Sequence, residues 1–184
     1  MPLSQESDRT RLPDTSPLLV FDEVYRAHFD FVYQRAVRLG GDGIDAEDAA
    51  QEVFGVVARK LRTFDGTSRV TTWLYGITLN VVRSMRRRAR IRRFWEGEHA
   101  AANADCVVQS VDRAEVMQAH RIAYAILDRM SAKKREVFIL AELEGLTCDE
   151  IAVIVGAKTE TVWSRLHYAR DEFARRLEKQ RGTR

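Results

Sequence analysis

Apolar residues recur every three to four positions in most of the 184-residue chain, and this spacing predicts helices rather than strands. The first predicted helix spans 21–39 and ends at three glycines within 40–43. Asp45 can cap the second helix, which continues to Leu61. Its predicted buried face is formed by Ala46, Ala49, Ala50, Val53, Phe54, Val57 and Leu61.

A third predicted helix follows the loop 64–66 and extends to Arg93, with Thr67 or Ser68 as its possible cap. On a helical projection six of its apolar residues share one stripe, which we expect to be buried. They are Val70, Trp73, Leu74, Ile77, Val81 and Met85.

Helical periodicity resumes near Ala114, and Ser131 can cap a further helix that ends at Gly145. The Thr-x-x-Glu pattern of 147–150 is a capping box, and a longer helix is predicted over 159–178. Across these two helices a small residue, a glycine and a valine are separated by the intervals typical of a helix-turn-helix. These residues are Ala152, Gly156 and Val162. The alternative is a plain antiparallel helical hairpin, which would not need that spacing.

The pattern therefore predicts an all-α protein of two small helical domains. All three prolines lie in the first 17 residues, which suits a helical body. We expect a disordered leader over 1–17, a first domain over 18–93, a flexible linker over 94–113, and a second domain, containing the helix-turn-helix, over 114–184.

The distribution of charge along the chain singles out one segment, residues 67–93. Residues 67–93 carry eight arginines and no acidic residue, although the net charge of the whole chain is only +3. Such a concentrated cation favours a polyanion with closely spaced charges.

Within this segment a line of residues follows the edge of the apolar stripe at helical spacing. It consists of Trp73, Gly76, Asn80, Arg83 and Arg87. An aromatic ring can stack on a base, the glycine leaves room for a backbone, and guanidinium groups bind phosphates, so the line suits a single nucleic-acid strand. The alternative is an amphipathic helix with a solvated basic end.

The second predicted helix exposes Glu47, Asp48, Gln51 and Glu52. This acidic face is either a solvated helix start or a docking surface for a basic partner.

A carboxylate-bound metal is not expected, because the only Glu-x-x-His spacing, Glu96–His99, has a poor helical context. We expect no metal, no cofactor and no disulfide between Cys106 and Cys148. No apolar run reaches membrane-spanning length, so a cytoplasmic protein without membrane contact is expected.

Four segments together resemble the extracytoplasmic-function class of bacterial sigma factors. They read DAEDAAQEVF, FDGTSRVTTWLYGITLNVVRSMRRR, REVFILAELEGLTCDEIAVIVG and TVWSRLHYAR. The resemblance covers nearly all of 21–177, with the motifs in order and correctly spaced. It implies two helical domains that give core RNA polymerase its choice of promoter. It also implies an anti-sigma factor as a regulatory partner.

The resemblance further implies roles for particular residues of the first domain. Asp48, Gln51 and Glu52 match the motif that docks on the clamp helices of the polymerase. The segment that opens and holds the −10 element corresponds to Trp73, Asn80, Arg83 and Arg87. The loop 65–69, with Asp65, Ser68 and Arg69, lies where the family captures a flipped base.

The second domain resembles the part that binds the polymerase flap and reads the −35 element in duplex DNA. Its candidate residues are Lys158, Glu160, Thr161, Trp163, Ser164, Arg165, His167 and Tyr168. The chain departs from the family where Trp163 and Tyr168 replace basic residues. Trp163 either contacts DNA or packs on a neighbouring helix, since tryptophan suits half-buried interfaces.

Two other classes of function compete with this one. An autonomous helix-turn-helix repressor would explain the second domain, but not an arginine-edged aromatic helix behind an acidic one. An enzyme is not expected, because the chain lacks Gly-x-Ser-x-Gly, His-Glu-x-x-His and a phosphate-binding loop.

Overall fold

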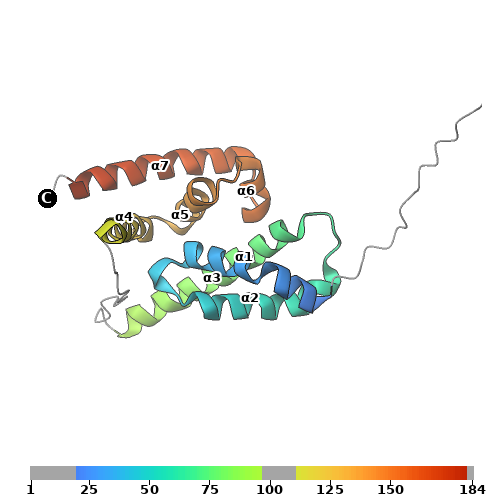
Figure 1. The fold of residues 1–184 in the computed structure, drawn as a ribbon. Helices are drawn as coiled ribbons and strands as arrows, with labels where there is room; N and C mark the ends of the chain where they lie inside the picture. The colour runs from blue at the N-terminus through green and yellow to red at the C-terminus, as the bar shows by residue number, and fades with distance from the viewer. Residues whose placement is uncertain (1–19, 97–110, 182–184) are drawn as a thin grey trace, which may run out of the picture.

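The computed structural model describes residues 20–96 and 111–181. These residues form seven α-helices with short helical turns between them and no strand, which confirms the all-α prediction (Figure 1). The predicted leader and the middle of the predicted linker lie outside the described residues. Helix α3 continues to Glu96 and α4 begins at Val111, so both helices extend into the segment predicted as linker.

The first domain packs three helices, α1 (Phe21–Gly40), α2 (Ala46–Lys60) and α3 (Val70–Glu96), around one apolar core. Asp45 caps α2 as predicted, because its carboxylate accepts hydrogen bonds from the backbone N–H groups of Glu47 (2.8 Å) and Asp48 (3.1 Å). The core residues are Val24, Val32, Ala50, Val53, Phe54, Val57, Leu74, Ile77 and Val81.

The start of α3 differs from the prediction. The first helical turn closes with a hydrogen bond from Trp73 N–H to the Arg69 carbonyl (3.1 Å), so Arg69 occupies the N-cap position. Neither Thr67 nor Ser68 does so. Thr67 instead donates its N–H (3.0 Å) and its hydroxyl (2.8 Å) to the Asp65 carboxylate.

The second domain contains α4 (Val111–Asp128), α5 (Ala132–Phe138), α6 (Cys148–Val155) and α7 (Thr159–Arg181), with a π-helical turn at Ile139–Leu143. Helices α6 and α7 form the predicted helix-turn-helix. Gly156 takes a left-handed conformation at the turn (φ 64°), which glycine adopts without strain. Ala152 and Val162 are both buried where the two helices meet.

The capping box predicted from the sequence begins α6. The Thr147 hydroxyl accepts from Glu150 N–H (3.3 Å), and the Glu150 carboxylate accepts from Thr147 N–H (2.9 Å). Backbone and side-chain hydrogen bonds from Thr147 lower the pKa of the Glu150 carboxyl. This stabilisation is therefore present at neutral pH and is lost as the pH falls through that lowered value.

Replacement of Thr147 by alanine is expected to lower the free energy of unfolding by about 1 kcal/mol, because the N-cap acceptor of α6 is lost. Ser131→Ala is the matched control, since Ser131 occupies the N-cap position of α5 without a side-chain hydrogen bond. Urea titrations of both variants measure the difference. Equal losses for the two variants would show that the Thr147 cap contributes nothing specific.

The two domains share a core, which the helical periodicity did not predict. Leu39, Tyr75, Leu79 and Val82 of the first domain pack with buried residues of the second, among them Tyr124, Leu127, Met130, Ile139 and Leu140. Helix α3 is thus apolar on two faces, one toward α1 and α2 and one toward the second domain. Figure 1 shows α5 and α6 lying against the three-helix domain.

Buried charges also join the domains. The Glu144 carboxylate, almost fully buried, pairs with Arg35 (3.1 Å) and Arg38 (2.9 Å) of α1. The Arg135 guanidinium, 4% exposed, donates to the carbonyls of Leu39 and Gly40 at the end of α1. These pairs lie where a charge without a partner would be costly, so the contact between the domains depends on them.

Candidate nucleic-acid interface

One strip of α3 faces solvent in the first domain. The Trp73 ring is half-buried and lies against the Phe64 ring, with centroids 5.0 Å apart. Asn80 and Arg87 are exposed, and a side chain added at Gly76 would meet no atom within 4 Å. Asn80, Arg87 and the space over Gly76 therefore form an open surface, and the half-buried Trp73 lies at one end of it.

Arg83, the fifth residue of that line, faces the second domain. Its guanidinium makes two hydrogen bonds to the Glu136 carboxylate (2.7 and 2.6 Å) and a longer one to the Asn80 amide oxygen (3.3 Å). The bonds to Glu136 raise the pKa of Arg83. In this arrangement of the domains, Arg83 is not available to a strand.

The remaining arginines of α3 divide into two groups. Arg86 pairs with Asp128 (2.6 Å) and Arg88 pairs with Glu52 (2.8 Å). Among the described residues, Arg87, Arg90, Arg92 and Arg93 have no acidic partner, and Arg93 donates only to the Ala89 carbonyl (3.4 Å). The chain therefore neutralises part of its cationic segment and leaves the rest free to bind an anion.

The loop before α3 presents Asp65 and Arg69 to solvent, with Ser68 half-buried between them. The two hydrogen bonds from Thr67 lower the pKa of the Asp65 carboxyl, so it is ionised at neutral pH. Gly66 has a positive φ (71°), which turns the loop toward the start of α3. The loop and Trp73 thus lie at the same end of the strip.

Only part of the acidic face of α2 is exposed without an ion pair. Asp48 and Gln51 are exposed, whereas the Glu52 carboxylate is held by Arg88. In the ranges that the structure describes, no group of three or more His, Cys, Asp or Glu side chains could hold a metal ion.

The exposed face of the helix-turn-helix is formed by the start of α7. Thr161 and Arg165 are half-buried, and the other candidate residues are exposed: Lys158, Glu160, Trp163, Ser164, His167 and Tyr168. Trp163 is 59% exposed, so most of its surface is open to solvent and it is not part of the core. The Tyr168 ring lies near the His167 ring (5.4 Å between centroids) and near Lys134 Nζ (6.0 Å from the ring centroid).

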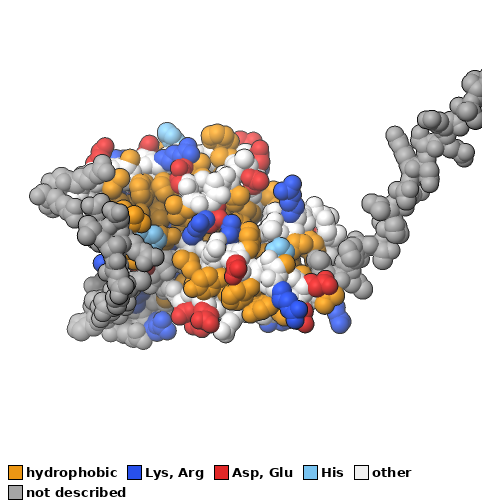
Figure 2. Space-filling model, viewed as in Figure 1, with side chains coloured by type: hydrophobic (Ala, Val, Ile, Leu, Met, Phe, Trp, Pro, Cys, Tyr) orange, Lys and Arg blue, Asp and Glu red, His pale blue; other side chains and the backbone are white. Residues whose placement is uncertain are grey.

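The face shown in Figure 2 has a different charge distribution. Acidic and basic side chains are interspersed over both domains on that face, with apolar side chains exposed between them. The side chains on this face are thus mixed in charge, unlike the run of arginines along α3.

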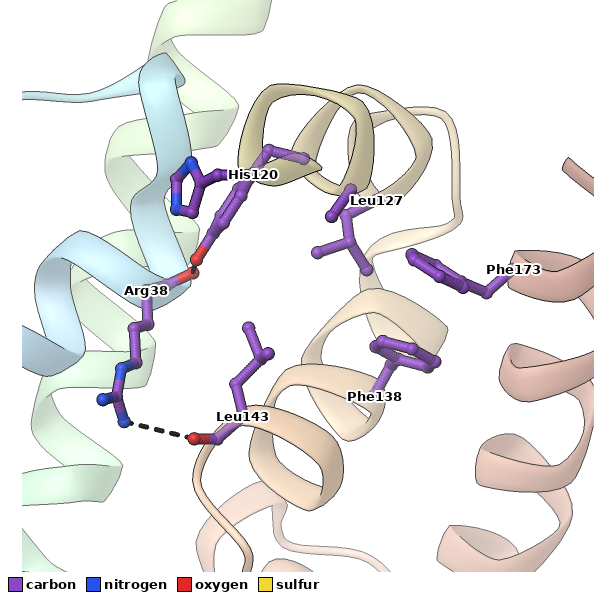
Figure 3. Close-up of a pocket in the computed structure, with 8 residues that line it drawn as sticks. Arg38, His120, Leu127, Phe138, Leu143 and Phe173 are labelled. Atoms are coloured by element: carbon purple, nitrogen blue, oxygen red, sulfur yellow. Dashed lines mark hydrogen bonds between the residues drawn. The ribbon is translucent and has the colours of Figure 1, made fainter. Parts of the chain in front are cut away.

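A small pocket of about 260 Å³ lies where α4, α5 and α7 approach the end of α1. Figure 3 shows Leu127, Phe138 and Phe173 lining it, and Arg38 donating to the Leu143 carbonyl (3.2 Å) at its edge. The Tyr124 hydroxyl donates to the Arg38 carbonyl (3.0 Å), which also joins the domains. The pocket is mainly apolar and lies apart from the candidate residues.

Sequence reasoning missed the residues that place these surfaces relative to one another: Arg135, Glu136 and Glu144. No motif or periodicity marked them as special. For Arg135 and Glu136 the only available signal was a charge beside Val137 and Phe138 on α5, and for Glu144 there was none.

Comparisons with known proteins identify the family of both domains. Residues 24–92 match the family model described as Sigma-70 region 2, and residues 120–173 match that of Sigma-70, region 4. Among the described helices, none combines the length and hydropathy needed to cross a bilayer.

Two curated proteins are similar over most of this chain. The ECF RNA polymerase sigma factor SigE of Mycolicibacterium smegmatis is 34% identical over 170 residues, covering 87% of this chain and 62% of that protein. The RNA polymerase sigma-H factor of Pseudomonas aeruginosa is 30% identical, covering 77% of this chain and 78% of that protein.

A solved structure shares the fold. It is the sigma factor RpoE from Bartonella quintana in complex with the anti-sigma factor NepR, with a TM-score of 0.64 and 23% identity over 86% of this chain and 96% of that one.

Proposed function

The chain belongs to the sigma-70 family, as an RNA polymerase sigma factor of the extracytoplasmic-function class, and on this premise we propose how its surfaces select and open a promoter. Sigma factors are not enzymes. In this proposal the chain makes or breaks no bond; it binds core polymerase and promoter DNA in the cytoplasm.

The exposed strip of α3 is the observation that carries the proposal for the −10 element. Trp73 stacks on a base at the edge of the opened segment, Asn80 contacts the strand, and Arg87 binds phosphate. Extrusion of a base costs a few kcal/mol, which stacking and a shaped pocket can offset. The loop residues Asp65, Ser68 and Arg69 form that pocket beside Trp73.

The exposed start of α7 supports the proposal for the −35 element. A second helix of a helix-turn-helix enters the major groove and presents its first turns to base edges. Lys158, Glu160, Thr161, Ser164, Arg165 and His167 are placed on those turns or beside them. Trp163 and Tyr168 are exposed there, so aromatic contacts to bases or sugars replace two of the family's cationic contacts.

We propose that Asp48 and Gln51 dock on the clamp helices of core polymerase and that the second domain binds the flap. Glu52 joins this interface only when it leaves Arg88. An anti-sigma factor is a further proposed partner, because the similar RpoE from Bartonella quintana is solved in complex with one.

Substitution of both Asp48 and Gln51 by alanine is expected to weaken binding to core polymerase by about 10- to 100-fold, as central interface residues contribute about 1–3 kcal/mol together. Competition against a labelled wild-type chain measures the affinity. Glu23→Ala, an exposed acid in the first turn of α1, is the control. An unchanged affinity of the double variant would remove the docking assignment.

The function itself is tested by adding the purified chain to core polymerase and a promoter library, then sequencing the 5′ ends of the transcripts. New transcripts that share two upstream elements support the proposal. A chain that binds duplex DNA and only blocks transcription by another holoenzyme would instead be the helix-turn-helix repressor.

A further inference from the structure

The second domain covers part of the surface proposed to hold the opened strand. Arg83, one of the five residues in the predicted line on α3, lines the groove between the two domains. Its guanidinium donates two short hydrogen bonds to the Glu136 carboxylate of α5 (2.7 and 2.6 Å), and the Glu136 side chain is only 9% exposed. A guanidinium binds a phosphate through the same pair of parallel hydrogen bonds. The Glu136 carboxylate therefore takes the place that a phosphate of the strand would have on Arg83.

A second acidic group of the same domain lies near the loop before α3. Hydrogen bonds from Thr147 are the main cause of the lowered pKa of Glu150, and the nearby charge of Arg69 lowers it further. Arg69 belongs to the loop proposed to hold the flipped base. The Asp149 carboxylate accepts from the Thr159 hydroxyl (2.9 Å), which brings the start of α7 to the same end of α3. Carboxylates of the second domain therefore face the candidate −10 surface at two separate places.

The same packing brings the two DNA-reading surfaces too close together for a promoter. The two elements are named for positions about 25 base pairs apart, which is about 85 Å of straight duplex at 3.4 Å per base pair. The whole of α3, at 27 residues and 1.5 Å per residue, is only about 40 Å long. Thr159 begins α7 and bonds to the neighbour of Glu150, so α7 starts close to the loop that contains Arg69. In this arrangement the chain cannot bind both elements at once.

The contact between the domains is strong enough to persist in the free chain. Leu79 and Val82 of α3 share a buried core with Leu127 and Leu140 of the second domain. The nearly buried Glu144 carboxylate adds ion pairs to two arginines of α1. Domains move freely relative to one another unless their interface is large and apolar, and this interface is apolar at its centre. The free chain is therefore expected to keep its domains together.

We propose that the free chain inhibits itself: the Glu136 carboxylate replaces a DNA phosphate on Arg83, and the domains must separate before the chain binds a promoter. The inference rests on the proposed function and adds a regulation of the same −10 surface. Strand binding and closure of the domains compete for Arg83, so each weakens the other by the same factor. Core polymerase binds the two domains at different places, its clamp helices and its flap, and thereby favours the open state.

The first test measures how tightly the complete chain, without polymerase, binds a labelled single-stranded oligonucleotide. The oligonucleotide carries the −10 element of a promoter mapped by sequencing 5′ ends of transcripts. Glu136→Gln removes the charge that holds Arg83 and nearly keeps the size of the side chain. We expect this variant to bind the oligonucleotide about tenfold more tightly than the unmodified chain. With core polymerase present the domains are already apart, so the two chains should bind it equally.

Glu142→Gln is the matched control, because the Glu142 carboxylate pairs with Arg170 of its own domain (2.7 Å). This control should bind the oligonucleotide like the unmodified chain. Equal gains for the two variants would show a general effect of charge and would overturn the proposal. The absence of a gain for Glu136→Gln, including no binding by either chain, would overturn it as well.

A second test follows the separation of the domains without changing Glu136. Dyes attached through Ala58→Cys in α2 and Ala174→Cys in α7, both exposed positions, report the distance between the domains by energy transfer. Cys106→Ser and Cys148→Ser remove the native thiols. The oligonucleotide and core polymerase should each lower a transfer efficiency that is high in the free chain.

A low efficiency in the free chain, or a high one that neither addition changes, would contradict self-inhibition. If the unmodified chain directs no transcription, the proposed function fails as well. If it directs transcription while its domains stay together on polymerase, only this inference fails.

Discussion

Replacement of Trp73 by alanine is expected to slow promoter opening by about 10- to 100-fold while leaving duplex binding nearly unchanged. Stacking of a base on an aromatic side chain is worth about 1–3 kcal/mol, and each 1.4 kcal/mol changes an equilibrium tenfold. One side of the Trp73 ring lies against Phe64. A side chain added at Gly76, one turn further along α3, would meet no atom within 4 Å, and the Trp73 ring itself is half-buried.

Permanganate reactivity of unpaired thymines measures the opening, and a template with a pre-melted bubble provides the rescue. The Trp73→Ala variant should regain its activity on the bubble template, because the two DNA strands there are already unpaired. Trp73→Phe keeps an aromatic ring beside Phe64 but is smaller than the indole. It therefore tests whether stacking alone, without the size of tryptophan, supports opening. If the bubble does not rescue Trp73→Ala, or if its melting temperature shows that the first domain is unfolded, the stacking role is wrong.

Replacement of Arg135 by alanine is expected to separate the two domains, the second large effect. The guanidinium is 4% exposed, and burial lowers its pKa to about 10, so it is still charged at neutral pH. Its removal leaves the Leu39 and Gly40 carbonyls without these donors and Asp128 with one partner fewer, at a cost of about 2–4 kcal/mol. Most of these contacts join one domain to the other. The lost free energy therefore weakens the association of the two domains.

Small-angle scattering of the free chain measures this change as an increased radius of gyration. Lys133→Ala, an exposed position on the same helix, is the control. Because Glu136 adjoins Arg135, separation also releases Arg83. The variant should therefore bind a single-stranded −10 oligonucleotide several-fold more tightly in the absence of polymerase. An unchanged radius with an unchanged unfolding midpoint would show that the interface does not depend on Arg135.

Local sequence patterns predicted the elements of this fold well. Asp45, Thr147 and Gly156 act at helix ends as their residue types indicate, because a cap satisfies backbone groups only two to four residues away. The predicted stripe of α3 is buried or half-buried against the first domain. The second apolar face, with Tyr75, Leu79 and Val82, was missed because it is buried only by the other domain.

The sequence by itself determined that the chain is helical, that it contains a helix-turn-helix, and that its arginines concentrate in one segment. Only the tertiary structure decided which of those arginines are free. The partners of Arg83, Arg86 and Arg88 lie 53, 42 and 36 residues away in the chain. Helical periodicity relates residues one turn apart and carries no information about such pairs. The packing of α3 against α2 and against the second domain supplies it, and thereby leaves Arg87, Arg90 and Arg92 as the described α3 arginines with no partner in the described chain.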